Sequence, residues 1–139
     1  MNTQFQWDED MVIVYAVKIP EKSTIHDFLK EYILSRGLKG GIILGIGGLE
    51  YAEVGHFDPA SRRYLIREIK AGETVLEVSS MTGNYLVKQD GDVSVHVHVT
   101  LATPGNVLAG HLVKGIVNPF IEAFLVELGS DVEKAFTHR

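Results

Sequence analysis

A nine-residue run of alternating apolar and polar side chains constrains the fold of this chain more than any other feature. The segment Val93–Leu101 reads VSVHVHVTL, with an apolar residue at every odd position. Such alternation, rich in β-branched residues, predicts a strand with one buried face, because successive side chains on a strand point to opposite sides. The valines then face a core, while His96 and His98 share the other face with Ser94 and Thr100.

Two imidazoles on one face of a strand are candidate metal ligands. His96 and His98, at positions i and i+2, are expected about 7 Å apart at Cα, near enough to bind one ion with bonds of about 2.0–2.1 Å. A third histidine, His111, follows a turn at Pro104-Gly105-Asn106. If the flanking runs form a hairpin, His111 returns beside the other two. Three neutral imidazoles with an open fourth position are typical of catalytic zinc. The alternative interpretation is that these are ordinary strand residues satisfied by hydrogen bonds, since His-x-His is a short motif.

A carboxylate in the middle of another predicted strand is a second candidate for the site. Alternation from Val75 places Glu77, Ser79 and Met81 on one side of that strand, with Leu76 on the other. A mid-strand carboxylate is costly unless it is paired, hydrogen-bonded or close to a cation. Glu77 is therefore either a partner in a structural salt bridge or a fourth ligand or catalytic general base beside the metal.

Composition and charge exclude several classes of function. A length of 139 residues suits one ordinary domain, and 45% hydrophobic with 22% charged residues is typical of soluble globular proteins. With 18 acidic against 13 basic side chains the net charge is −5, so direct binding to nucleic acid is not expected. The absence of cysteine excludes disulfides and thiolate zinc sites. No apolar run is long enough for a membrane span and the amino-terminal segment is acidic, so we expect no membrane association and a cytoplasmic location.

The remaining periodicity predicts an α+β fold. Apolar residues recur at helical spacing over Ser23–Arg36, with Thr24 as the expected N-cap and Gly37 beyond the last turn. We expect one domain over residues 1–139, with a core of about 11–128, a polar and loosely held tail at 129–139, and the early helix packed on a mainly antiparallel sheet or sandwich. About eight short strands are predicted, at residues 11–17, 40–50, 51–57, 64–70, 75–81, 93–101, 108–117 and 120–128.

Glycines mark two further features. The segment Gly45-Ile46-Gly47-Gly48 follows a strand but opens no helix and lacks the G-x-G-x-x-G order, so a nucleotide site is not expected. These glycines instead allow close approach of another backbone or of a neighbouring subunit. Turns are predicted at Gly83-Asn84 and at Asp90-Gly91-Asp92, leading into the histidine strand.

Five segments follow one another along the chain: Pro20–Ile25, Gly40–Ala52, Leu76–Asn84, His96–His98 and Gly110–Gly115. In this order they resemble the plants-and-prokaryotes conserved (PPC) domain, in its stand-alone prokaryotic form. The resemblance implies an α+β fold and a homotrimer in which glycine-rich strands pack between subunits. It also implies zinc at His96, His98 and His111, as in the metal-capable prokaryotic members. A water or a small-molecule ligand would complete the coordination shell of the zinc. The activity is unassigned and could be that of a metal-dependent lyase or hydrolase on a small molecule.

Two comparisons qualify this resemblance. Plant members bind DNA through an Arg-Gly-Arg-Pro hook, which is missing from this sequence. The alternative function is therefore a regulatory module that joins a DNA-associated assembly through protein contacts, without catalysis.

The histidine pattern also resembles acetolactate decarboxylase, in which His-x-His and a later histidine hold zinc. That enzyme adds an arginine and further carboxylates, for which Arg67 and Glu77 are the candidates here.

Overall fold

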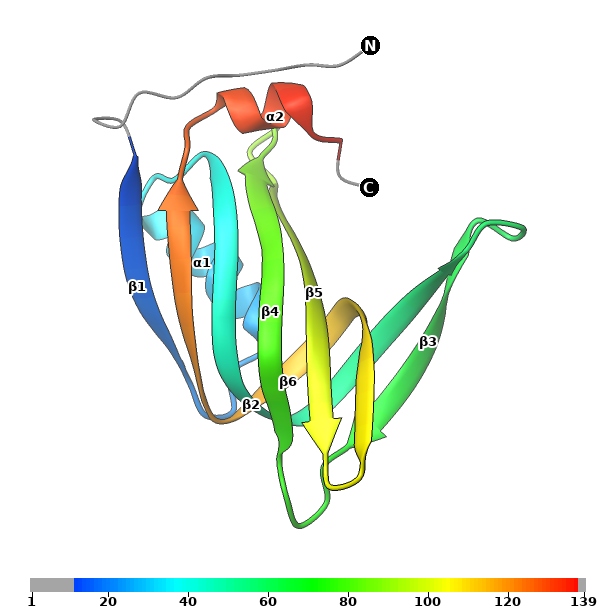
Figure 1. Ribbon diagram of the computed structural model, residues 1–139. Helices are drawn as coiled ribbons and strands as arrows, with labels where there is room; N and C mark the ends of the chain where they lie inside the picture. Colours follow the sequence, from blue (N-terminus) through cyan, green and yellow to red (C-terminus); the bar gives the residue numbers. More distant parts are fainter. Residues whose placement is uncertain (1–11, 138–139) are drawn as a thin grey trace.

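The computed structural model describes residues 12–137, which form an antiparallel sheet with two helices (Figure 1). The predicted α+β class, with an early helix packed on the sheet, is confirmed. Met11, where the first strand was expected to begin, and the acidic segment before it lie outside the described residues. Neither described helix has the length and hydropathy needed to cross a bilayer. The elements are β1 (Ile13–Pro20), α1 (Ile25–Ser35), β2 (Gly40–Asp58), β3 (Arg63–Lys70), β4 (Leu76–Val87), β5 (Val93–Thr103), β6 (Asn106–Glu127) and α2 (Asp131–Ala135).

Two long strands, β2 and β6, run side by side and organise the sheet. Their register extends from Gly41 opposite Glu127 to Gly55 opposite His111. One half of this pair is flanked by β1, on β6, and by β4, on β2. The other half is flanked by β5, on β6, and by β3, on β2. Because β5 also pairs with β4, the histidine strand joins the two parts of the sheet.

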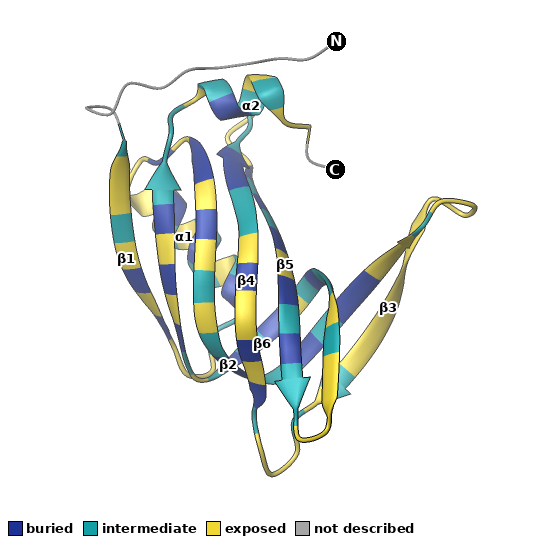
Figure 2. Ribbon diagram, viewed as in Figure 1, coloured by how far each residue is buried: buried dark blue, intermediate teal, exposed yellow. Residues whose placement is uncertain are grey.

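The core lies between the sheet and α1, and the burial patterns of α1 and β5 follow the predicted periodicities. Ile25, Leu29 and Ile33 of α1 are fully buried, as the helical spacing predicted. Figure 2 shows the same contrast between buried and exposed positions along the strands. Thr24 is the N-cap residue, although its side chain makes no cap hydrogen bond, and Gly37 follows the helix with φ of +66°. Alternate residues of β5 are buried: Val93, Val95, Val97, Val99 and Leu101.

The prediction of eight short strands is wrong, because two pairs of expected strands are continuous. Residues 40–58 form one strand and residues 106–127 another. The register between β2 and β6 shifts between Gly47 and Leu49, so that the backbone at Asn118-Pro119 bulges opposite Gly48. A proline is tolerated at such a bulge, where it interrupts no ladder hydrogen bond. The predicted close approach of another backbone to these glycines is confirmed, since a Cβ on Gly48 would clash with the Asn118 carbonyl oxygen.

Two further expectations also need correction. Gly83-Asn84 is not a turn but lies inside β4, where Gly83 faces Val97 and a Cβ on it would clash with the carbonyl of His96. The expected loose tail at 129–139 instead contains α2, in which Val132 is buried against β2 and β4. A single buried apolar residue in so short a helix leaves little periodicity to detect.

Candidate metal centre

The three predicted ligands meet on one face of the sheet. His98 of β5 lies directly opposite His111 of β6, because the hairpin through Pro104-Gly105 sets that register. His96 precedes His98 by two residues and points to the same face. One nitrogen from each ring lies within 4.8 Å of one nitrogen from each of the others. The structure therefore brings all three predicted ligands together.

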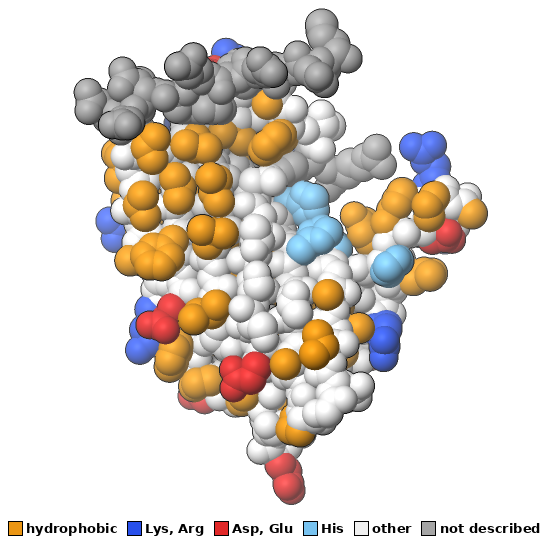
Figure 3. Space-filling view, viewed as in Figure 1, with side chains coloured by type: hydrophobic (Ala, Val, Ile, Leu, Met, Phe, Trp, Pro, Cys, Tyr) orange, Lys and Arg blue, Asp and Glu red, His pale blue; other side chains and the backbone are white. Residues whose placement is uncertain are grey.

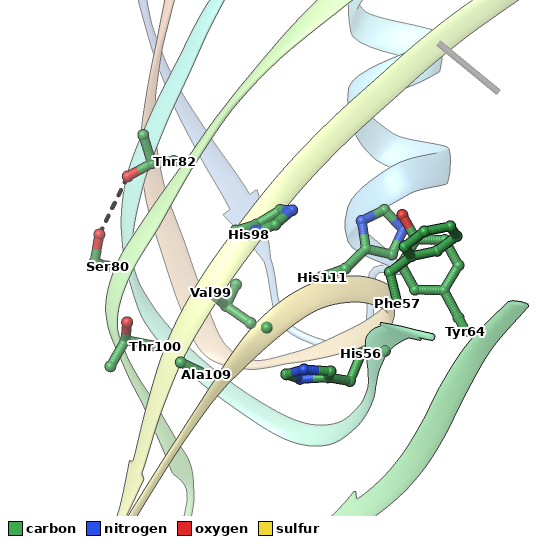
Figure 4. A pocket seen from close by; sticks show the side chains of 12 residues that line it. His56, Phe57, Tyr64, Ser80, Thr82, His98, Val99, Thr100, Ala109 and His111 are labelled. Carbon is green, nitrogen blue, oxygen red and sulfur yellow. Dashed lines mark hydrogen bonds between the residues drawn. The ribbon is translucent and has the colours of Figure 1, made fainter. Parts of the chain in front are cut away.

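The rings are inclined to one another around a shared space. The interplanar angles are 64° between His96 and His98, 57° between His96 and His111, and 81° between His98 and His111. Figure 4 shows His98 and His111 on neighbouring strands with their rings on the same side. Tetrahedral zinc with bonds of about 2.0–2.1 Å requires ligand nitrogens about 3.3 Å apart. In the present structure the three ligand nitrogens lie within 4.8 Å of one another.

Burial keeps two of the imidazoles in the form that binds metal. It lowers the pKa of His111, an effect strengthened by His96 and His98, and it also lowers the pKa of His96, with His98 adding to the shift. A neutral imidazole is the ligand form. The Nδ1 atom of His111 is buried and has no hydrogen-bond partner within residues 12–137. A buried polar atom left in this state costs about 1–3 kcal/mol. The donor set, its protonation and this unpaired nitrogen all fit a bound divalent metal ion.

A cleft of about 560 Å³ opens beside the histidines. Ser80 and Thr82 of β4 face it, with their hydroxyl oxygens 3.2 Å apart, and Thr82 is the register partner of His98. Phe57 and Tyr64 lie at the opposite side (Figure 4). Among the described residues no lysine, arginine, aspartate or glutamate lines this space, so a bound cation would dominate its electrostatics. The lining residues are Gly55, His56, Phe57, Tyr64, Ser80, Thr82, His98, Val99, Thr100, Ala109, Gly110 and His111.

The aromatic side of the cleft was not predicted from the sequence. Tyr64 of β3 stacks on His111, with ring centroids 4.6 Å apart and an interplanar angle of 21°. Phe57, its register partner on β2, contacts Tyr64 edge-on at 5.5 Å. The local pattern predicts that Tyr64 lies in a strand. Its position beside the histidines depends on the pairing of β3 with β2 and of β2 with β6, for which the sequence carries no local signal.

The structure does not bring Glu77 to the histidines. Its register partner on β5 is Ala102, four residues beyond His98, which corresponds to about 13 Å along the strand. Glu77 is exposed, is absent from the cleft lining and forms no salt bridge with any described residue. The predicted alternation also fails here, because a bulge between Val78 and Ser80 turns Met81 into the core and Ser80 toward the cleft.

Arg67, the other residue suggested by the decarboxylase pattern, also lies elsewhere. It lines a separate cavity of about 200 Å³ together with Ile69, Leu76 and Leu101. Its register partner is Val54, which is buried, whereas His111 pairs with Gly55. Arg67 and His111 therefore point to opposite faces of the sheet.

His26 of α1 is a fourth histidine near the centre that the sequence did not single out. Burial lowers its pKa to about 4, and the charges of Lys30 and His111 act in the same direction, while Asp27 opposes them. Its Nδ1 is buried and has no hydrogen-bond partner among the described residues. His26 does not belong to the three-histidine cluster. Its electrostatic coupling to His111 places it close behind the site.

Comparison with a protein-family model identifies the relationship. Residues 9–129 match the model of the Plants and Prokaryotes Conserved (PCC, also written PPC) domain. The chain belongs to the PCC domain family. A PPC protein from Pyrococcus horikoshii is 32% identical, with a TM-score of 0.78 over 92% of this chain and 84% of that chain. The resemblance predicted from the five sequence segments is confirmed.

Other solved structures share the PCC fold. A metal-containing protein from Archaeoglobus fulgidus is 24% identical, with a TM-score of 0.79 over 93% of this chain and 86% of that one. A protein from Bacteroides thetaiotaomicron described as a "putative dna binding protein" is 27% identical, with a TM-score of 0.74 over 82% and 78% of the two chains. No match was found among curated proteins.

The fold also resembles that of an enzyme. Acetolactate decarboxylase from Bacillus subtilis superposes with a TM-score of 0.60 at 15% identity, over 91% of this chain and 56% of the enzyme. The PCC domain described here therefore spans about half of that enzyme's length, and the likeness is one of fold. The predicted resemblance to this enzyme is confirmed at that level.

Proposed function

We propose that this PCC domain protein binds one zinc ion through His96, His98 and His111 and presents it to a small molecule in the adjoining cleft. The observation that carries the proposal is the convergence of three imidazoles, from two neighbouring strands, within 4.8 Å. The similar protein from Archaeoglobus fulgidus is described as metal-containing, which agrees with this assignment. Such a site leaves at least one coordination position open.

The chemistry of the cleft indicates the class of ligand. An ion held by three neutral imidazoles keeps its full positive charge, and within residues 12–137 no lining side chain carries a compensating negative charge. A small oxyanion, such as a carboxylate, is the ligand that this arrangement favours. The hydroxyl groups of Ser80 and Thr82 can donate hydrogen bonds to it, while Tyr64 and Phe57 cover its apolar part.

A lyase or hydrolase reaction on that small molecule is the activity we propose. When bound, the metal would act as a Lewis acid on a ligand oxygen or lower the pKa of a bound water. The chain contributes the neutral imidazoles, the hydroxyl donors, and the aromatic side of the cleft. Glu77 has no part in this proposal because it lies outside the cleft.

We further propose that the protein assembles as a homotrimer through an exposed apolar surface. This surface lies on β1, β2 and β6 (Figure 3). Contiguous exposed apolar side chains of this kind mark interaction sites. Register places the surface on the same sheet face as the histidines, since Leu44 pairs with Thr82 and Thr82 with His98. Its residues are Val14, Ile42, Leu44, Ile46 and Phe124.

A DNA-associated role is the second candidate, favoured by the description of the Bacteroides thetaiotaomicron structure. The net charge of −5 argues against direct contact with phosphates, so this role requires contact with another protein. A gel-shift titration separates the possibilities. Retardation of a DNA fragment by the purified protein, with steep salt dependence, would show direct binding, and its absence would leave only a role through contact with another protein.

Elemental analysis of purified, zinc-loaded protein after dialysis tests the metal assignment. We expect about one zinc per chain in the wild type and a loss of bound zinc in His98→Ala, because one of three ligands is removed. The matched control is His56→Ala, since His56 lines the same cleft but lies outside the cluster. Equal zinc content in the two variants, or none in the wild type, would contradict the proposal.

A further inference from the structure

The β2–β3 arm, defined here as residues 54–67, projects from the body of the sheet and carries Tyr64 (Figure 1). Register shows how the arm reaches the metal centre. His98 pairs with His111, His111 pairs with Gly55, and Gly55 pairs with Ile66 of β3. These four residues form one row across the sheet. Tyr64 lies two residues from Ile66 and therefore on the same face as the histidines.

Gly55 provides the space through which Tyr64 reaches His111. A Cβ atom on Gly55 would lie 3.0 Å from Cδ1 and 3.3 Å from Cβ of Tyr64. The tyrosine side chain thus lies diagonally over a position with no side chain, an arrangement within reach of aromatic residues on paired strands. Because Gly55 has no side chain, the tyrosine ring can stack on the His111 imidazole, with ring centroids 4.6 Å apart and an interplanar angle of 21°.

In the metal-free protein, no hydrogen bond through Nδ1 fixes the ring of His111. This nitrogen is buried and has no hydrogen-bond partner among the described residues, which leaves it available to the metal. On the side that faces the arm, the stacked ring of Tyr64 limits the rotation of the His111 ring.

We propose that Tyr64 is a positioning residue of the metal centre and that, through it, the β2–β3 arm sets the affinity for metal. This inference rests on the proposed function, since it requires zinc at the three histidines. A ring that donates to a metal ion gains partial positive charge, which the face of an aromatic ring stabilises. By linkage, metal bound to His111 must stabilise the arm in return.

Zinc affinity, measured by competition with a chromophoric chelator, tests the role of Tyr64. We expect Tyr64→Ala to weaken binding about tenfold, the lower end of the range for loss of an outer-shell partner. Tyr64→Phe keeps the stacked ring and should stay within about twofold of wild type. Leu65→Ala is the matched control and should also leave the affinity unchanged. Leu65 is its neighbour on β3, points to the opposite face and is 61% exposed.

Two further measurements separate positioning from a general structural role. In metal-free protein, NMR should show an upfield ring-current shift of the His111 ring protons that persists in Tyr64→Phe and disappears in Tyr64→Ala. Hydrogen exchange of the arm amides should slow on zinc binding in the wild type but not in Tyr64→Ala. An equal melting temperature of the metal-free variants would show that the fold is retained.

The possible outcomes distinguish this inference from the proposed function. If wild type binds zinc, His98→Ala does not, and Tyr64→Ala binds as tightly as wild type, only the role of Tyr64 is refuted. If wild type binds no zinc, both proposals fail. If Tyr64→Phe loses as much affinity as Tyr64→Ala, the hydroxyl rather than the stacked ring is responsible, and the positioning role assigned here is wrong.

Discussion

Replacement of His26 should change how the stability of this protein depends on pH. The pKa of His26 is about 4 in the folded chain, chiefly because of burial, against an ordinary value of 6.5. Between these values the unfolded chain binds one more proton than the folded chain, so stability falls as pH falls. The contribution is fully present above pH 6.5 and is lost as pH decreases toward 4.

The magnitude follows from that difference. A separation of 2.5 pKa units, from 6.5 to about 4, corresponds to about 3 kcal/mol at 1.36 kcal/mol per unit. Between pH 7 and pH 5 the free energy of unfolding falls by about 2 kcal/mol through this group, because protonation of His26 in the unfolded chain is nearly complete at pH 5. The neighbouring groups that contribute to this shift are Lys30, His111 and Asp27.

Urea unfolding of metal-free protein at the two pH values provides the assay. Between pH 7 and pH 5 the free energy of unfolding of wild type should fall by about 2 kcal/mol more than that of His26→Gln, because the glutamine takes up no proton. The control is His56→Gln, which replaces an exposed histidine and should keep the wild-type dependence. An identical loss in wild type and in His26→Gln would refute the reasoning.

Three other predictions follow from the structure. Glu77→Gln should leave zinc content and affinity unchanged in the chelator assay, because Glu77 lies outside the cleft; reduced zinc content would show that the carboxylate reaches the metal. Leu29→Ala should lower the free energy of unfolding by about 2–5 kcal/mol in urea titration, because Leu29 is fully buried. Leu34→Ala, at a 57% exposed position of α1, should change it by less than about 0.5 kcal/mol. Equal effects of the two substitutions would show that Leu29 does not lie in the core. Excess zinc should raise the melting temperature of wild type but not of His98→Ala, since only the intact cluster binds the ion in the folded state; equal shifts would indicate another site.

The sequence predicted that His96, His98 and His111 meet because the decisive information is local. Alternation over Val93–Leu101 determines which face carries His96 and His98, and the turn before His111 determines the hairpin register. Both signals lie within a few residues of the ligands. The helix was predicted for the same reason, since its apolar spacing matches one buried stripe.

Features that depend on distant pairing were predicted poorly. The glycines of β2 were expected to allow close approach of another backbone, but the identity of that backbone depends on the pairing with the distant strand β6. The bulge after Val78 reversed the expected alternation, so that Met81 lies in the core and not on the same side as Glu77. Tyr64 could not be linked to His111 because two strand pairings intervene between them.

Anomalous diffraction at the zinc absorption edge, from crystals grown with zinc, tests the central claim most directly. The account predicts one strong peak per chain, at about 2.0–2.1 Å from one nitrogen of each of His96, His98 and His111. The claim would be contradicted by a map without a peak among these three rings, with each imidazole instead hydrogen-bonded to a main-chain carbonyl.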